Sequence, residues 1–394
     1  MTKIDGRSLI ALILLGTVVL TAGEASSKQA YTERDFLALA RKIEGSMRRG
    51  DASVLDSAID LDAMLDKAMS GYSVDQKLKD GFRKGAKEGM HKNSFGRQIL
   101  ASMQKSGSYK FLRLYRAQDG HRLLFRLLGS DGGLNYHSML LGTARPDGIR
   151  ISDLYVYLTG ELFSDTLRRG FLPLAYDSQR GFFEKILGWE SDFVKNLPKV
   201  RKMQSLGKEG KPKEALQIYF ELPQTLQQDK TFLLLRTIYA SQAGNNKEYE
   251  DAMKEYQKNF PNDPSVDLVV LDAYVLSKKY GAAIQSINRI NKSIGGDPYL
   301  GALRANVHVM DGKLGPAKES AQKAIADEPG LVEGYWSLVS VSLTEKNYQE
   351  TARLLRHIEK KLGIELNDLK NASEYAGFVQ SPEYREWTKS RTQR

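Results

Sequence analysis

The side chains best suited to chemistry lie near the middle of the chain, where polar and apolar residues alternate. Alternate residues of a strand share one face. If such a face lined a cavity, its polar groups could orient a ligand or move protons. The three series are Arg122, Leu124 and Arg126; Asn135, His137 and Met139; and Asp153, Tyr155 and Tyr157.

Two interpretations of these series remain open. In one, Arg126, His137, Asp153 and Tyr155 converge in a pocket that binds a small molecule or a substrate. In the other, the polar residues form a solvated sheet face with cross-strand pairs of arginine and acid. The second interpretation is favoured, because the sequence fixes neither the register of the strands nor the face that points inward.

Catalytic and metal-binding motifs are missing from the rest of the chain. It has no His-Glu-x-x-His, no Gly-x-Ser-x-Gly and no phosphate-binding Gly-Lys-Ser/Thr. The five histidines are isolated and there is no cysteine, which excludes thiol catalysis and thiolate metal sites. The sequence therefore predicts no metal site and no cofactor, and it favours a non-enzyme over an enzyme.

The elements that carry the polar series are predicted as a meander of strands. Apolar residues recur every second position in four segments, 109–117, 121–129, 134–142 and 150–160. Turn signals such as Asp119-Gly120 lie between these segments. Short turns imply antiparallel pairing. Helical periodicity dominates the preceding residues 31–105, so an α+β domain is expected over about 31–175. This order of elements resembles the cone-shaped fold of nuclear transport factor and ketosteroid isomerase.

The predicted helices before the strands include two long ones, at about 52–69 and 74–105. In the second, Gly81, Gly85 and Gly89 are spaced four apart. Such a stripe predicts that another backbone approaches this helix closely. A phosphate-binding loop is disfavoured, because no strand precedes it and no Gly-x-Gly-x-x-Gly is present.

The C-terminal half repeats itself every 34 residues. The turn-forming positions that define the step are Gly210, Gly244, Lys278, Gly312 and Lys346. After each of them comes a helical pattern such as GKPKEALQIY (210–219) or KYGAAIQSI (279–287). This pattern resembles the tetratricopeptide repeat (TPR), a helix–turn–helix unit of that length. The resemblance covers residues 196–365 and implies five repeats, which stack into an all-α solenoid.

The TPR resemblance also implies a binding surface. In the family, the first helix of each unit lines a concave groove, which often holds a protein or peptide. The equivalent positions here are Gln204, Gln242, Asp272, Tyr299, Asn306, Trp336 and Ser340. The family's clamp for a peptide carboxylate is not reproduced, since only Asn306 stands at a suitable position. Tyr299 and Trp336 fit packing between helices equally well.

The N-terminus has the pattern of a targeting segment. Lys3 and Arg7 precede an apolar run at 9–20, which is shorter than the roughly 20 residues of a membrane span. Residues 1–25 are therefore predicted as a signal peptide, or residues 9–22 as an uncleaved anchor. Export places the body in the bacterial periplasm or another extracytoplasmic space. The net charge of +10 then favours an anionic membrane or wall surface over nucleic acid as an acidic partner.

These observations predict an exported interaction scaffold that binds a protein or peptide in its TPR groove. The alternative is an enzyme or small-molecule binder with its site in the α+β domain. The predicted segments are 1–25 (signal), 31–175 (α+β domain), 176–195 (helical linker), 196–365 (repeats) and 366–394 (capping helices and basic tail). Because each repeat depends chiefly on its neighbours, residues 196–394 are expected to fold alone.

Overall fold

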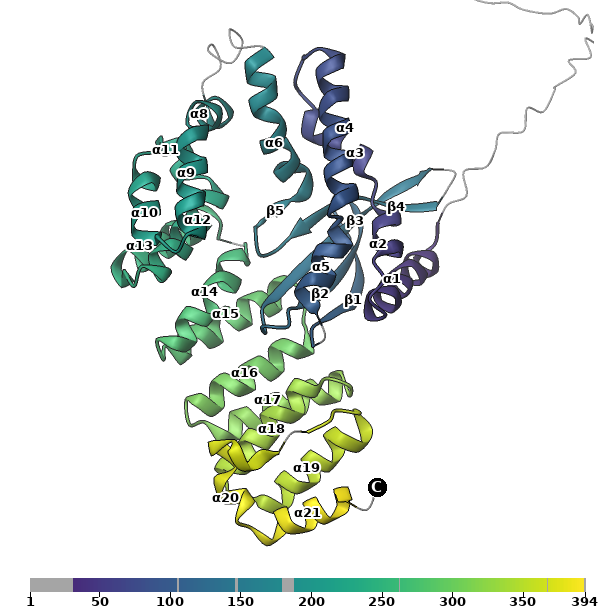
Figure 1. Ribbon diagram of the computed structural model, residues 1–394, viewed down its shortest axis with the longest axis vertical. Coiled ribbons are helices and arrows are strands. Elements are labelled where there is room, and N and C mark those ends of the chain that lie inside the picture. Colours follow the sequence, from purple (N-terminus) through teal and green to yellow (C-terminus); the bar gives the residue numbers. More distant parts are fainter. Residues whose placement is uncertain are drawn as a thin grey trace, which may run out of the picture.

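The computed structural model describes residues 31–104, 106–145, 148–178, 188–261, 263–366 and 368–392. An N-terminal head of helices and a five-stranded sheet is followed by an array of paired helices (Figure 1). The predicted fold class, an α+β domain followed by an all-α solenoid, is confirmed. The predicted signal peptide lies outside the described residues. Within the part that is described, no helix is long and apolar enough to cross a membrane.

The head begins with helices that are shorter than predicted. Their bounds are α1 (Glu33–Arg48), α2 (Ser53–Ala58), α3 (Leu61–Met69), α4 (Gln76–Lys92) and α5 (Phe95–Met103). The predicted helix at 52–69 is interrupted because Ile59 forms a bridge to Ile151 and Asp60 then caps α3. The predicted helix at 74–105 is interrupted where Ser94 caps α5, with its hydroxyl accepting from the backbone of Arg97.

The glycine stripe of α4 faces away from the rest of the described chain. A Cβ atom added at Gly81, Gly85 or Gly89 would meet nothing within 4 Å. Leu78 and Phe82, beside the stripe on the same helix, pack against the head. The prediction of a close backbone approach at this stripe is therefore wrong for contacts among the described residues.

The sheet is a simple antiparallel meander with strand order β1-β2-β3-β4-β5. Its strands are β1 (Ser108–Ala117), β2 (Gly120–Leu128), β3 (Leu134–Arg145), β4 (Gly148–Val156) and β5 (Glu161–Leu162). One face, with Leu123, Phe125 and Met139, packs against α1, α2 and α5 and forms the head core. The other face points toward the array, so neither face of this sheet is simply solvated.

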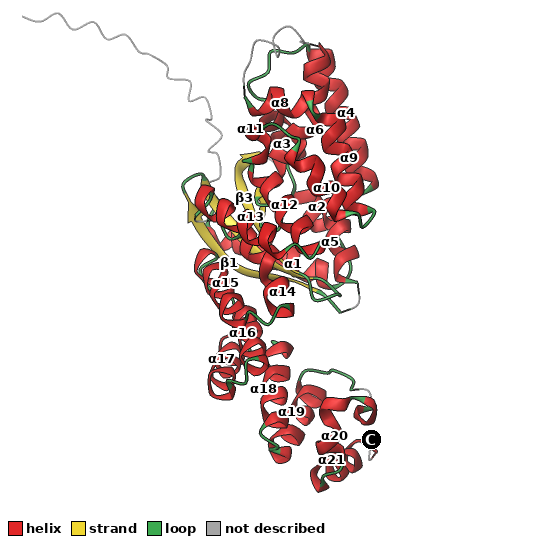
Figure 2. Ribbon diagram, turned by 90° about the vertical axis from the view of Figure 1, so that its left-hand side faces the viewer, coloured by secondary structure: helices red, strands yellow, loops and turns green. Residues whose placement is uncertain are grey.

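Among the described residues, α6 (Phe163–Ser178) and α8 (Trp189–Lys195) lead from the head into the array. The paired helices of the array are α9 (Leu197–Lys208) with α10 (Pro212–Phe220), α12 (Lys230–Gln242) with α13 (Asn246–Asn259), α14 (Ser265–Leu276) with α15 (Tyr280–Ser293), α16 (Pro298–Met310) with α17 (Leu314–Asp327), and α18 (Val332–Thr344) with α19 (Tyr348–Lys361). The short helix α11 (Gln224–Gln227) precedes α12. In Figure 2 these pairs stack one below another.

The turn inside each pair has the same backbone conformation. Gly210, Gly244, Lys278, Gly312 and Lys346 all have positive φ, between 56° and 72°. An L-residue adopts this left-handed conformation only at a cost, so its recurrence even at the two lysines marks a fixed turn geometry. The 34-residue step of the sequence is therefore a structural period.

The hydrophobic cores cross the boundaries between the predicted segments. One buried cluster joins Leu65 and Phe171 of the head to Phe193 of α8 and to Met203 and Phe232 of the array. At the far end, four buried aromatic residues cover the last helix pair: Tyr375, Phe378, Tyr384 and Trp387. They belong to η2 (Ser373–Tyr375), α20 (Ala376–Val379) and α21 (Pro382–Thr392), after η1 (Leu369–Asn371).

Candidate functional site

The array meets the sheet at the edge where the first helices of the pairs begin. Cross-strand pairing places Arg126 beside Tyr136, and Ser138 beside Tyr155, all on the face directed at the array. Leu124, Tyr136 and Tyr157 of this face share a buried cluster with Leu268 and Leu300 of the array. The polar side chains of the face lie around this cluster.

Three aspartates of the array are spaced 34 residues apart, and two of them, Asp263 and Asp297, accept hydrogen bonds from polar side chains of this sheet face. Asp229, Asp263 and Asp297 stand at or just before the starts of α12, α14 and α16, and each accepts backbone N–H bonds there. A carboxylate at a helix start is stabilised by free N–H groups and by the helix dipole. We call these three residues the aspartate ladder. The sequence shows the ladder in QDKT, NDPS and GDPY, but sequence reasoning missed it.

Asp297 is the most buried member of the ladder, with a side chain that is 0% exposed. It accepts hydrogen bonds from Arg126 Nη1 at 2.5 Å and from the Tyr136 hydroxyl at 2.8 Å. Arg126, itself 2% exposed, also bonds both carboxylate oxygens of Glu328, at 3.1 and 3.3 Å. The guanidinium lies 5.3 Å from the ring centre of Tyr299. Burial alone would lower the pKa of Arg126, but the two carboxylates outweigh it and raise that pKa.

Asp263 holds the next contact along the sheet. It accepts from the Tyr155 hydroxyl at 2.7 Å, from Lys230 Nζ at 2.5 Å and from the Tyr256 hydroxyl at 2.9 Å. Burial raises the pKa of this carboxyl, but the hydrogen bonds and charge of Lys230, together with the other donors, outweigh burial and lower it overall. The carboxylate is therefore a stable anionic link between head and array.

The four residues of the predicted pocket do not converge. Arg126 and Tyr155 are engaged with the array, as described above. Asp153 is fully buried and accepts from the hydroxyl of Ser164 at 2.6 Å, at the start of α6. His137 lies on the opposite face, because it pairs with Phe125 across β2 and β3.

His137 is a buried residue of the head core. Its ring nitrogens lie 3.1 Å from the Tyr109 hydroxyl and 3.2 Å from the Asn135 amide nitrogen. Burial lowers the pKa of His137 from 6.5 to about 3, so the ring is neutral near pH 7. Its surroundings are those of a structural histidine.

The predicted groove residues lie along the first helices of the pairs. Gln204, Gln242 and Asp272 are exposed, whereas Tyr299, Asn306, Trp336 and Ser340 are partly buried. Tyr299 is covered by Arg126, which removes it from a free groove. Asn306 accepts a 2.8 Å hydrogen bond from Ser337 on the neighbouring first helix. Trp336 packs partly against the distal core.

Two apolar residues that sequence reasoning missed stand beside these positions. Leu276 is 84% exposed and Met310 is 56% exposed. They occupy the last positions of α14 and α16 and are 34 residues apart, four residues beyond Asp272 and Asn306. Their period could have been found in the sequence, but their exposure could not. They lie at the ends of α14 and α16 remote from the aspartate ladder.

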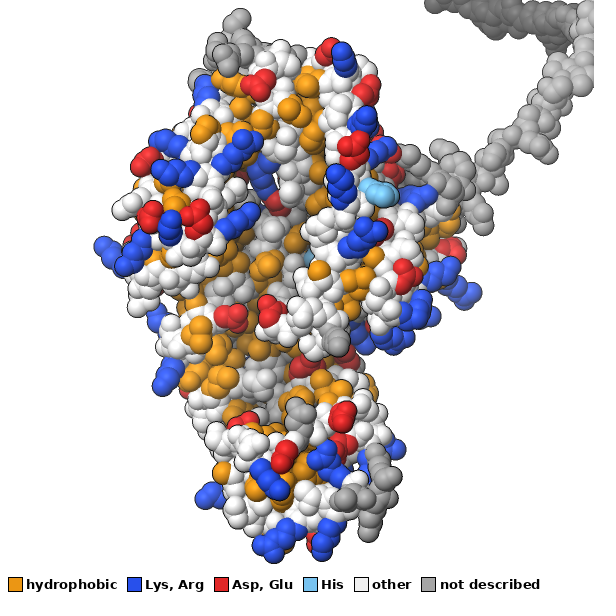
Figure 3. Space-filling view, viewed as in Figure 1, with side chains coloured by type: hydrophobic (Ala, Val, Ile, Leu, Met, Phe, Trp, Pro, Cys, Tyr) orange, Lys and Arg blue, Asp and Glu red, His pale blue; other side chains and the backbone are white. Residues whose placement is uncertain are grey.

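A cleft of about 580 Å³ opens between the head and the start of the array. Its walls come from β2, β4, β5, α6, α8 and α12, and include Tyr155, Glu161, Asp165, Trp189 and Asp229. Figure 3 shows acidic and basic side chains meeting in the hollow between the upper helices of the head and of the array. We call this cavity the junction cleft.

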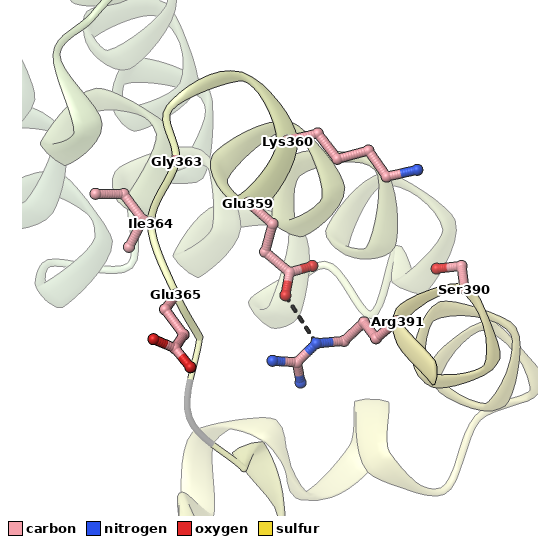
Figure 4. Close-up of a pocket in the computed structure, with 7 residues that line it drawn as sticks. All are labelled: Glu359, Lys360, Gly363, Ile364, Glu365, Ser390 and Arg391. Atoms are coloured by element: carbon pink, nitrogen blue, oxygen red, sulfur yellow. Dashed lines mark ion pairs between the residues drawn. The ribbon is translucent and has the colours of Figure 1, made fainter. Parts of the chain in front are cut away.

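A second cavity lies at the C-terminal cap, between α19 and α21 (Figure 4). Glu359 and Arg391 point into it and pair at 2.8 Å. Glu359 also accepts from the indole N–H of Trp387 at 3.1 Å, and Arg391 donates to the carbonyl of Leu366 at 2.6 Å. The polar groups of this cavity are thus used to fix the cap onto the last helix pair.

Among the described residues, no group of three or more His, Cys, Asp or Glu side chains is arranged to hold a metal ion. The array is a TPR-like helical domain whose first helices contact the α+β head at the edge where they begin.

No known protein family and no curated protein matches the chain. Among solved structures, MamA (residues 41 to the end) from Desulfovibrio magneticus RS-1 aligns with a TM-score of 0.37 and 18% identity, over 43% of this chain and 95% of that one. A MamA RS-1 ArsTM double mutant aligns with a TM-score of 0.36 and 17% identity, over 41% and 90%.

Proposed function

We propose that this protein is an exported interaction scaffold, which binds a protein or peptide on the groove-lining helices α14, α16 and α18. The helix pairs are proposed to be five TPR units, and the head to belong to the cone-shaped class. Residues 1–25 would direct export, or residues 9–22 would anchor the chain. The net charge of +10 supports an additional contact with an anionic membrane or wall surface.

The observation that carries this proposal is the exposure of Leu276 and Met310 at repeat-equivalent positions. Burial of such a side chain stabilises a fold by about 1.5–3 kcal/mol relative to its exposure. The fold of this chain does not gain that stabilisation at Leu276 and Met310. Exposed apolar residues in a common row, rather than scattered singly, mark interaction surfaces. The row lies on the edge of the array that the head leaves free.

Polar neighbours make this surface suited to an extended peptide. Asp272 and Asn306 lie one turn before Leu276 and Met310 on the same helices. Since Ser337 already donates to the Asn306 oxygen, the Asn306 amide nitrogen is the group that can donate to a ligand. A carboxylate, an amide and two apolar side chains can together bind a backbone and fix its side chains.

The rival function, an enzyme or small-molecule binder with a pocket formed by Arg126, His137, Asp153 and Tyr155, has less support. A deep cavity lined by these four would favour it. Instead, one sheet face is filled by the head core and the other is in contact with the array.

A peptide-selection experiment tests the proposed groove. Peptides are selected from a random library on the mature chain, and the strongest binder is titrated against wild type and the Leu276→Ser/Met310→Ser variant. Loss of two buried apolar contacts is expected to weaken binding at least tenfold, or about 1.4 kcal/mol. Because both side chains are exposed, the variant should unfold at the same urea concentration as wild type. Equal affinity for both proteins would remove this surface from consideration.

A second variant addresses the partly buried positions. The double variant Trp336→Ala/Asn306→Ala is expected to weaken binding of the same peptide. It should also lower the free energy of unfolding, because Trp336 packs against the distal core. Leu158→Ser, an exposed apolar residue of the head (45%), is the matched control and should leave peptide affinity unchanged. Export is tested separately by fractionation; an intact chain found free in the cytoplasm would contradict it.

A further inference from the structure

The junction cleft is built from parts that are distant in the sequence. Leu162 and Asp165 come from β5 and α6 of the head, Trp189 from α8, and Asp229 and Thr231 from α12 of the array. Its volume of about 580 Å³ lies within the range of small-molecule sites, about 300–1,000 Å³. Of the four residues predicted from the sequence to form a pocket, only Tyr155 lines this cleft.

Each cation that lines the cleft already has a carboxylate partner. Arg169 pairs with Glu161, and Lys230 pairs with Asp263 at 2.5 Å. Arg122 pairs with Asp119 at 2.6 Å, and Arg168 lies 3.8 Å from Glu190. The cations of the cleft are therefore not free to bind an anionic ligand without breaking these pairs.

Two carboxylates of the cleft remain without such a partner. Among the described residues, neither Asp165 nor Asp229 has a basic group within ion-pair distance. With the partners included, the four cations of the cleft are accompanied by six carboxylates, so two negative charges are left over. Burial raises the pKa of both carboxyls, although Arg168 and Arg169 respectively oppose this effect. A cation placed here would relieve the cost of burying these charges.

Two buried N–H groups next to the cleft lack an acceptor. Within the described chain, neither the indole Nε1 of Trp189 nor the Nε of Arg168 has a hydrogen-bond partner. Both residues line the cleft. Leaving a buried donor unpaired is costly, so each such group calls for an acceptor that the described residues do not supply.

We propose that the junction cleft binds a small organic ligand that carries an ammonium group close to an oxygen acceptor, as in an amino acid or the N-terminus of a peptide. Asp165 and Asp229 compensate the ammonium charge, and the oxygen accepts from Trp189 or Arg168. The indole ring, which stacks on Phe193 at 5.1 Å, forms an aromatic wall that also favours a cation. This site is separate from the groove and does not depend on it.

A graded series of probes of similar size tests the charge requirement. Lysinamide has two ammonium groups and a carbonyl, norleucinamide has one ammonium group, and N-acetylnorleucinamide has none. Isothermal titration of the mature chain is expected to give affinity in that order, with at least tenfold between the first and the last. Equal binding of the acetylated probe, tighter binding of glutarate, or no heat from any probe at millimolar concentration would overturn the proposal.

Two variants test the residues. Asp165→Asn should lower the affinity for lysinamide at least tenfold. The chain should remain folded, since the carboxylate that is replaced has no ion-pair partner in the described structure. Glu319→Gln removes an exposed carboxylate of α17 and should leave binding unchanged. Unchanged binding by Asp165→Asn would also overturn the assignment. A comparison of free lysine with the tripeptide Lys-Gly-Gly distinguishes a free amino acid from a peptide N-terminus.

Discussion

Replacement of Asp297 by asparagine is expected to loosen the head from the array while preserving the shape of the side chain. The carboxylate is fully buried and accepts from Arg126, Tyr136 and the backbone of Tyr299. Asparagine can still cap α16. Its NH2 group, however, would face donors, and Arg126 would keep only Glu328 as a carboxylate partner.

The expected cost follows from the burial of this cluster. Removal of one partner of a buried ion pair costs about 3–5 kcal/mol, because the remaining charge stays buried. Since Glu328 continues to compensate Arg126, the lower end, about 3 kcal/mol, applies to Asp297→Asn. The free energy of unfolding is measured by urea titration monitored by circular dichroism.

The matched control variant lacks a helix N-cap, but it keeps every contact between the head and the array. Asn245→Ala removes the side chain that caps α13 and should cost about 1 kcal/mol. In a double-mutant cycle, Arg126→Met and Asp297→Asn should show a coupling energy well above 1 kcal/mol. If Asp297→Asn costs no more than Asn245→Ala, or if the coupling is near zero, the cluster does not hold the head to the array.

Three further predictions concern other parts of the molecule. His137 is neutral when folded, with a pKa of about 3 against 6.5 unfolded, so its contribution to stability is complete above pH 6.5 and falls by about 1.4 kcal/mol per pH unit from there down to pH 3; in urea titrations His137→Gln should flatten this slope, and an unchanged slope would contradict it. Gly85→Ala should raise the free energy of unfolding by about 1 kcal/mol, because the added methyl meets nothing within 4 Å on an exposed helix face; a loss of stability in the same assay would count against the open stripe. Residues 196–394 alone should show weak hydrogen-exchange protection in their first two helix pairs, because these share a core with the head; uniform protection along the fragment would support independent folding instead.

The sequence was informative wherever a short-range period decides the structure. The 34-residue step predicted the helix pairs, and the period-two strands with their Gly-containing turns predicted the meander. Helix ends were harder to predict, because the hydrophobic pattern does not contain their causes. The break at Ile59 depends on a long-range bridge to Ile151, and the break at Asn93 depends on local capping of α5.

The site was less predictable because it depends on contacts between distant segments. The sequence indicated that Arg126 and Tyr155 could share a face, but not that Asp297 and Asp263 lie opposite them. The register of β3 decides whether His137 faces the core or the array, and a shift of one residue would have reversed it. The aspartate ladder was visible as a period in the sequence, yet its role required knowledge of which edge of the array meets the sheet.

The aspartate ladder also relates two spacings of different origin. Tyr155 on β4 and Arg126 on β2 lie two strands apart, about 9–10 Å, since neighbouring strands are about 4.8 Å apart. The helices they engage through Asp263 and Asp297 belong to successive pairs, and packed helices lie about 8–10 Å apart. The spacing of two strands in the sheet thus matches the spacing of one repeat in the solenoid. A partner that stretched or compressed the proximal repeats would break this match, whereas the distal pairs beyond Asp297, where Leu331 replaces the next aspartate, could change their pitch without doing so.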